Sequence, residues 1–202
     1  MLEYFIENWY LAVILLLVIA LTVYVVIKAW QAAAKTNRER EEALKKAEYE
    51  ESVVKQFRNL TVELAENAEA KRLFDGTALN IQRVLENEKY PDAKFNELNY
   101  EQKIVYAMYY YLDDTQKGLS EFYKCNGKPL TPWALEGIKE FLPENAKTLA
   151  QKEYDAFDPD NEEVSCTADV IAKLDAQYDE AMQGVDIYDD LKAFIIKHIN
   201  EF

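Results

Sequence analysis

Histidine and cysteine are scarce in this chain, which has one histidine and two cysteines. Cys125 and Cys166 are too few for a disulfide scaffold, and neither belongs to a Cys-x-x-Cys pair that would suggest a zinc site. We expect two reduced, buried thiols. His198 lies between the apolar residues Ile195 and Ile199, so we interpret it as a partly buried structural residue and not as a general base or metal ligand.

Signatures of catalysis are also absent from the sequence. There is no Walker A loop, no Gly-x-Ser-x-Gly and no His-Glu-x-x-His. Asp158, Asp160 and Glu162 resemble the start of a calcium-binding loop, with Asp169 at its twelfth position. Glu163 occupies the position where such a loop needs glycine, which favours a solvated acidic loop. The sequence therefore predicts a protein that is not an enzyme and has no cofactor and no metal site.

One long apolar run lies near the start of the chain. Residues 9–27 read WYLAVILLLVIALTVYVVI, without charge, proline or glycine, and can cross a hydrocarbon core of roughly 30 Å as a helix. A cleaved signal peptide would begin with basic residues, whereas the segment before this run is acidic. Trp9, Tyr10 and Trp30 bracket the run with rings that favour the headgroup region. The pattern predicts one transmembrane helix over residues 9–27, after a short external tail over residues 1–8.

The cations beside this run predict its orientation. No Lys or Arg precedes the run, and positive charge near the end of a span marks the cytoplasmic side. We therefore expect a single-pass protein of the cell membrane with its N-terminus outside and its C-terminal domain in the cytoplasm. The cations that follow the run are Lys28, Lys35, Arg38, Arg40, Lys45 and Lys46.

Negative charge is concentrated in the distal part of the chain. The formal net charge is -14, and residues 73–202 alone hold 13 basic and 26 acidic side chains. Such a surface repels nucleic acid and anionic lipid but attracts a basic protein, so we expect no direct binding of nucleic acid. The alternative interpretation is that the acidity only keeps the domain soluble.

The segment after the apolar run favours helix. Residues 28–70 contain no proline and no glycine, which predicts a long juxtamembrane helix over residues 28–72. Apolar residues recur in it at three- to four-residue steps, interrupted at Glu51 and Thr61. Docking of one helix face on the domain explains this pattern, and we favour it slightly over a parallel coiled coil that would make a homodimer. These apolar residues are Leu44, Ala47, Val54, Phe57 and Leu64.

Residues 73–202 are predicted to form a compact domain of several helices. Asp75-Gly76 predicts a break, after which Thr77 or Asn80 starts a helix. No alternating strand run competes, so the fold class is all-α: a single transmembrane helix, a long juxtamembrane helix and a multi-helix acidic domain.

Two further helix starts are predicted in this domain. Asn99 and Gln102 form a capping box that opens the best core helix. Thr131 and Pro132 have the chemistry of an N-cap and first helical position, and we expect the following Trp133 to be buried. The core helix has a wide apolar face, formed by Ile104, Val105, Met108, Tyr111 and Leu112. It also carries four tyrosines, namely Tyr111 and the neighbouring Tyr106, Tyr109 and Tyr110. We expect most of these tyrosines to lie in the core and the others to suit an interface.

A ridge of carboxylates on the last two predicted helices is the candidate partner-binding surface. Like charges four residues apart weaken a helix by roughly 0.2–0.5 kcal/mol, which favours a binding role. The six candidates are Asp175, Asp179, Glu180, Asp186, Asp189 and Asp190.

The stretch 98–202 resembles the DNA-mimic protein domain family, a group of acidic all-α bacterial proteins largely of unknown function. The segments LNYEQKIVYAMYYYLDD, KGLSEFYKCNG, LTPWALEGIKEF and LKAFIIKHINEF carry the resemblance. Members typically have an Asn-Asn-Gly-Gly-Phe-like segment, of which residues 115–119 keep only Gly118. The resemblance implies a helical domain whose carboxylates imitate DNA phosphates and occupy a DNA-binding protein.

Together these patterns predict a membrane-anchored interaction protein that binds a basic protein partner. The family resemblance implies that this partner is a nucleic-acid-binding protein. The alternative is a structural or accessory subunit of a membrane or envelope assembly.

Overall fold

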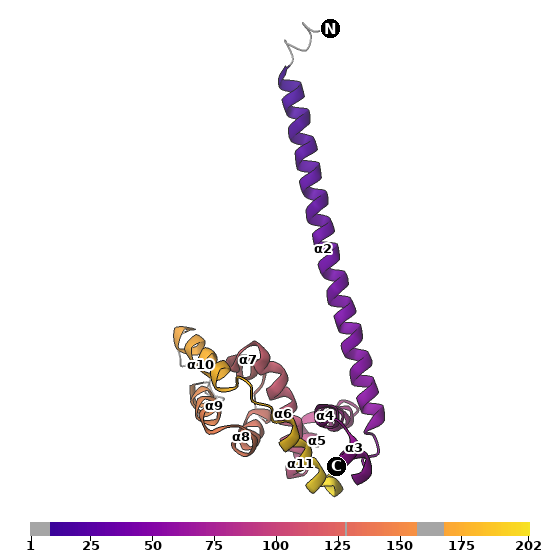
Figure 1. Cartoon of the computed structure of the whole chain (residues 1–202), viewed down its shortest axis with the longest axis vertical. Coiled ribbons are helices and arrows are strands. Elements are labelled where there is room, and N and C mark those ends of the chain that lie inside the picture. The colour runs from indigo at the N-terminus through magenta and orange to yellow at the C-terminus, as the bar shows by residue number, and fades with distance from the viewer. Residues whose placement is uncertain (1–8, 128, 157–167) are drawn as a thin grey trace. The chain divides into compact units, whose positions relative to one another are not determined.

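The computed structural model describes residues 9–127, 129–156 and 168–202, and every regular element in these ranges is helical (Figure 1). The chain divides into two compact units, Met1–Tyr49 and Glu50–Phe202. The predicted all-α class is therefore confirmed for the described residues. The predicted domain boundary between residues 72 and 73 falls inside a helix instead of at the division between the units.

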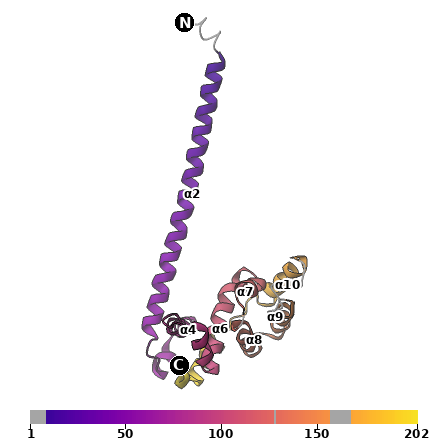
Figure 2. The ribbon, with the colours of Figure 1, turned by 180° about the vertical axis from the view of Figure 1, so that it is seen from behind.

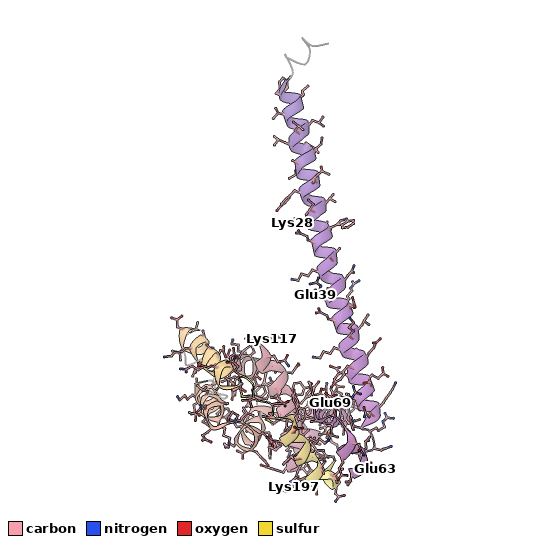
Figure 3. The ribbon with its side chains drawn as sticks, in the orientation of Figure 1. Lys28, Glu39, Glu63, Glu69, Lys117 and Lys197 are labelled. Atoms are coloured by element: carbon pink, nitrogen blue, oxygen red, sulfur yellow. The ribbon has the colours of Figure 1, made fainter. Side chains whose placement is uncertain are left out.

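The first unit holds most of α2 (Trp9–Gln56), the helix that contains the predicted span. From Val13 onward α2 is long and apolar enough to cross a membrane. Its apolar side chains are exposed around the helix, and Leu16 is 66% exposed. The polar group within the apolar run is satisfied locally, because the Thr22 hydroxyl donates to the Val18 carbonyl oxygen at 2.8 Å. Further along, Lys28 and Glu39 project from α2 (Figure 3).

The long juxtamembrane helix is shorter than predicted. α2 ends at Gln56, and a new helix, α3 (Val62–Asn67), begins six residues later. Thr61 caps it, because its side-chain oxygen accepts a hydrogen bond of 3.2 Å from the Leu64 backbone N–H. The prediction of one helix to residue 72 is therefore wrong beyond Gln56, where α2 ends and after which Thr61 starts a separate helix.

The predicted break at Asp75-Gly76 is also wrong, because α4 (Ala70–Glu86) runs through both residues. Gly76 serves close packing here. A Cβ atom at this position would meet the Phe57 ring and would lie 2.9 Å from the Val53 carbonyl oxygen. The glycine therefore lets the end of α2 approach α4 within the second unit, at the helix-propensity cost that glycine always carries.

The second unit is built on α6 (Tyr100–Asp114), which packs against α4 and against two later helices. In both ribbon views α4 and α11 lie on one side of α6 and α7 to α10 on the other (Figures 1 and 2). The remaining elements are α5 (Pro91–Glu97), α7 (Leu119–Cys125), α8 (Leu130–Phe141), α9 (Glu144–Ala156), α10 (Ala168–Ala181) and α11 (Tyr188–Lys197), with short 3-10 turns at Thr115–Lys117 and Ile199–Glu201.

The start of α6 confirms the predicted capping box. The Asn99 side-chain oxygen accepts from the Gln102 backbone N–H at 2.8 Å, and the Gln102 side chain accepts from the Asn99 N–H at 3.3 Å. The predicted apolar face is buried, apart from Leu112, which is half-buried. Ile104, Val105, Met108 and Tyr111 have no exposed surface. α6 is therefore the central core helix.

Two details of the expected core differ. α8 begins at Leu130, so Thr131 lies inside the helix and not at its N-cap. Trp133 is half-buried: its ring packs edge to face on Tyr100 at 5.8 Å, and Lys103 Nζ lies 5.0 Å from its centre. The expectation of a buried tryptophan is wrong because a neighbouring tyrosine and lysine cover the ring only in part.

The predictions for cysteine and histidine have mixed outcomes. Cys125 is a free thiol but is exposed, because it is the last residue of α7, so the expectation of a buried thiol is wrong there. Cys166 lies outside the described residues. His198 is partly buried, as predicted, with Nδ1 3.4 Å from Glu101 Oε1 and its ring 4.8 Å from that of Phe194.

Candidate partner-binding surfaces

The structure separates the six candidate carboxylates into two groups. Asp175, Asp179 and Glu180 lie on α10, whereas Asp189 and Asp190 lie on α11 and Asp186 lies in the connection before it. α10 packs against α7 and α9, while α11 packs against α4 and α3. Both ribbon views show the two helices apart in the second unit (Figures 1 and 2). The six residues therefore do not make one continuous ridge.

Asp175 has a structural role in this arrangement. Its Oδ1 accepts from the Ser120 backbone N–H at 2.7 Å, and its Oδ2 accepts from the Ser120 hydroxyl at 2.8 Å. The carboxylate also lies over Gly118, where φ is 124° and a Cβ atom would approach Asp175 Cγ to 3.1 Å. Asp175 thus supplies from α10 the cap that the first turn of α7 lacks locally.

Asp179 and Glu180 are exposed at the end of α10. Neither side chain takes part in an ion pair within the part of the chain that the structure describes. Two neighbouring unpaired carboxylates near a helix C-terminus oppose the helix dipole there. Their position therefore costs stability and leaves their charge available to a partner.

The three carboxylates near α11 have a local structural explanation. Asp186 Oδ1 accepts from the Tyr188 backbone N–H at 2.9 Å, just before the helix. Asp189 and Asp190 lie in the first turn, where the helix dipole favours negative charge. All three are nevertheless exposed. These three carboxylates can therefore stabilise the start of α11 and still be accessible to a partner.

Sequence reasoning missed Glu153, a buried carboxyl group on α9. The residue has no exposed surface, and neither side-chain oxygen has a hydrogen-bond partner among the described residues. Burial, and then the negative charge of Asp175, raise the pKa of Glu153 to about 7, while Lys124 acts in the opposite direction. The signal was its spacing: Ala146, Ala150 and Glu153 recur at four and three residues, on the buried face of the helix.

A second missed feature is an aromatic pocket beside α6. Tyr106 and Tyr110 are half-buried and line a cavity of about 230 Å³ together with Phe95. Helices α4, α5 and α6 and the start of α8 contribute to its walls. Of the four tyrosines on α6, only Tyr111 is fully buried, whereas Tyr106, Tyr109 and Tyr110 are half-buried.

The described ranges contain no group of three or more His, Cys, Asp or Glu side chains that could hold a metal ion. Of the residues that resemble a calcium loop, only Asp169 lies in a described range, on α10.

Comparison with protein-family models, with curated proteins and with solved structures finds no match to this chain.

Proposed function

We propose that the chain is a non-enzymatic, membrane-anchored interaction protein whose acidic helical domain binds a basic protein partner. The observation that carries this proposal is that one chain combines an apolar helix with a strongly acidic domain. The apolar part of α2 is exposed around the helix and suited to lipid, and residues 73–202 have a formal charge of -13. The first feature holds the protein at a membrane, and the second attracts cationic surfaces.

The membrane is the cell membrane, and the domain faces the cytoplasm. The cations from Lys28 to Lys46 support this orientation, because they follow the apolar run without any cation before it. In the cytoplasm the domain meets basic proteins that bind nucleic acid. The family resemblance supports such a partner, since duplex DNA presents roughly one charge per 1.7 Å of its axis and the carboxylates on each of the two helices can imitate part of such a row.

The binding surface consists of the exposed carboxylates on α10 and α11. Asp179 and Glu180 support this assignment best, because nothing in the described structure neutralises them and their position disfavours the helix. Asp186, Asp189 and Asp190 add a second exposed group. A partner that engages both groups would span two regions of the domain.

Partner capture from a cell lysate tests this function. The full chain in lipid nanodiscs is the bait, and captured proteins are identified by mass spectrometry at increasing salt. We expect basic proteins that are released as salt rises, because screening reduces the reach of the charges to about 8 Å at physiological ionic strength. A variant with amides at Asp179, Glu180, Asp186 and Asp189 should capture less.

The matched control carries amides at Glu39, Glu41, Glu42 and Glu48 on α2, which changes the net charge equally. It should capture as much as the unchanged protein. Equal capture by both variants at low salt would show that the acidic groups only solvate the domain.

One observation favours the second candidate, a structural or accessory subunit of a membrane assembly. The docking interpretation of the juxtamembrane segment holds for Val54 and Phe57, which are buried, but not for Leu44, which is 65% exposed. Residues 28–48 of α2 are exposed throughout and are available for lateral contact with a membrane protein or a second copy of the chain. Capture of membrane subunits that is insensitive to salt would select this candidate.

A further inference from the structure

Three aromatic side chains line the pocket beside α6. The ring centres of Phe95 and Tyr106 lie 5.8 Å apart, and those of Tyr106 and Tyr110 lie 5.1 Å apart with an angle of 68° between the planes. The rings meet at an angle and do not stack, and all three side chains line the cavity. Burial raises the pKa of Tyr106 and of Tyr110, so both hydroxyl groups stay neutral at physiological pH.

Two carboxylates line the same cavity. Glu86 comes from the end of α4 and Asp92 from the first turn of α5. Gln82 Nε2 donates to Glu86 Oε1 at 2.6 Å, which fixes that carboxylate near the pocket. Neither Glu86 nor Asp92 takes part in an ion pair within the described ranges. Among the described residues, the pocket therefore combines aromatic side chains with two carboxylates that make no ion pair.

This combination selects a cation. Aromatic ring faces attract an ammonium group placed within about 6 Å of their centre, and carboxylates at the rim add to the attraction. The remaining wall, which includes Leu85, Pro129 and Leu130, is apolar and suits a methylene stem. A volume of about 230 Å³ is below the roughly 300–1,000 Å³ of typical small-molecule sites, so the pocket suits one side chain.

We propose that this pocket receives a lysine side chain of the basic protein partner, with the ammonium group against Tyr106, Tyr110 and Glu86. The proposal rests on the proposed function and deepens it. The exposed carboxylates of α10 and α11 supply long-range attraction, whereas this pocket supplies a specific anchor. An anchor of this kind determines which basic protein stays bound.

Ligand-observed saturation-transfer NMR tests the pocket with the full chain in nanodiscs. The probe is lysine with its N-terminus acetylated and its C-terminus methylamidated, and the comparison is norleucine capped in the same way. We expect saturation of the lysine side-chain protons, competed by tetramethylammonium, and none for norleucine. Equal saturation of both compounds would overturn the proposal, and so would binding of tetramethylammonium without binding of capped lysine.

Two variants locate the binding. Glu86→Lys changes an exposed side chain, so it leaves the core intact and should abolish saturation of the lysine probe. Tyr110→Leu with Glu86→Gln should weaken binding about tenfold or more. The control is Tyr100→Leu with Glu140→Gln, the same change at another tyrosine of α6 and a carboxylate close to it, and it should bind as the unchanged protein does. Unchanged binding by Glu86→Lys would overturn the proposal.

Failure of the pocket and failure of the proposed function give different results. If the pocket assignment alone is wrong, the lysine probe does not bind but the basic partner is still captured in a salt-dependent way. If the proposed function alone is wrong, the probe binds and Glu86→Lys abolishes its binding, but no basic protein is captured.

Discussion

The hydroxyl group of Tyr111 donates a hydrogen bond of 2.7 Å to the hydroxyl group of Tyr178, and this bond joins α6 to α10 in the interior of the domain. Both side chains are buried, and their rings also meet edge to face at 6.3 Å. A buried hydroxyl group that loses its partner has no water to replace it. This pair therefore holds the helix that bears Asp179 and Glu180 on the core.

Replacement of Tyr111 by phenylalanine tests this bond. Tyr111→Phe should lower the free energy of unfolding by about 1–2 kcal/mol, because the ring stays in place but Tyr178 loses a buried partner. The control is Tyr110→Phe on the same helix, whose hydroxyl has only a 3.5 Å contact with Tyr106. It should cost less than about 0.5 kcal/mol in a urea titration. Equal losses in both variants would contradict the structure.

Glu153 makes stability depend on pH. Its pKa is raised from 4.5 to about 7 in the folded protein, so between these values the folded state binds more protons than the unfolded state. Stability contributed by this group is therefore complete below about pH 4.5 and is lost as the pH rises through 7. The shift corresponds to a loss on the order of 3 kcal/mol by pH 8.

The variant Glu153→Gln should remove this dependence and raise the melting temperature at pH 8 relative to the unchanged protein. Its effect at pH 5 should be smaller, because the native carboxyl group is then protonated. Glu144→Gln, an exposed change on the same helix, serves as the control and should leave the pH profile unchanged. A pH profile that stays the same in Glu153→Gln would show that this group titrates normally.

The packing of Gly76 predicts a cost for a single methyl group. Gly76→Ala should destabilise the domain by about 1–3 kcal/mol, because the new Cβ meets the Phe57 ring and the Val53 carbonyl. Helix propensity alone would give the opposite sign, a gain of about 1 kcal/mol. Gly127→Ala is the control, since nothing lies within 4 Å of its added Cβ. Stabilisation by Gly76→Ala in thermal unfolding would exclude the close approach.

The proposed membrane anchoring by α2 predicts the behaviour of the chain on fractionation. The protein should remain in the membrane pellet after an alkaline carbonate wash, because the apolar run is held by lipid. Leu16→Arg with Ile19→Arg should release it, since each arginine near the centre of a span costs about 2.5–3.5 kcal/mol. Digestion of the domain by protease added to intact cells would reverse the proposed orientation.

Predictability from the sequence depended on whether the signal was local. The capping box at Asn99 and Gln102 and the apolar face of α6 follow from side-chain chemistry within one helix, and both are confirmed. Gly76 misled because glycine breaks an isolated helix but also permits two helices to pack closely, and only the Phe57 contact distinguishes these uses. The end of α2 at Gln56 was not predicted, because the composition favours helix throughout this segment and the single N-cap residue Thr61 was the only local signal of a new helix.

The candidate surface was harder to predict than the fold. A row of acidic residues in the sequence gives no information on which helices become neighbours, so α10 and α11 were expected to form one ridge although they pack on different partners. The pocket of Phe95, Tyr106 and Tyr110 depends on α5 and α6 both packing against α4, which no local pattern encodes.

The bond between Asp175 and Ser120 affects how substitutions among the acidic residues are interpreted. Asp175→Ala would remove negative charge as Asp179→Ala does, but it would also release the first turn of α7, because alanine has no oxygen to accept from Ser120. A loss of binding in that variant would report a loosened helix. The acidic residues of the domain are therefore not equivalent in a substitution series, because the carboxylate of Asp175 also holds the start of α7 in place.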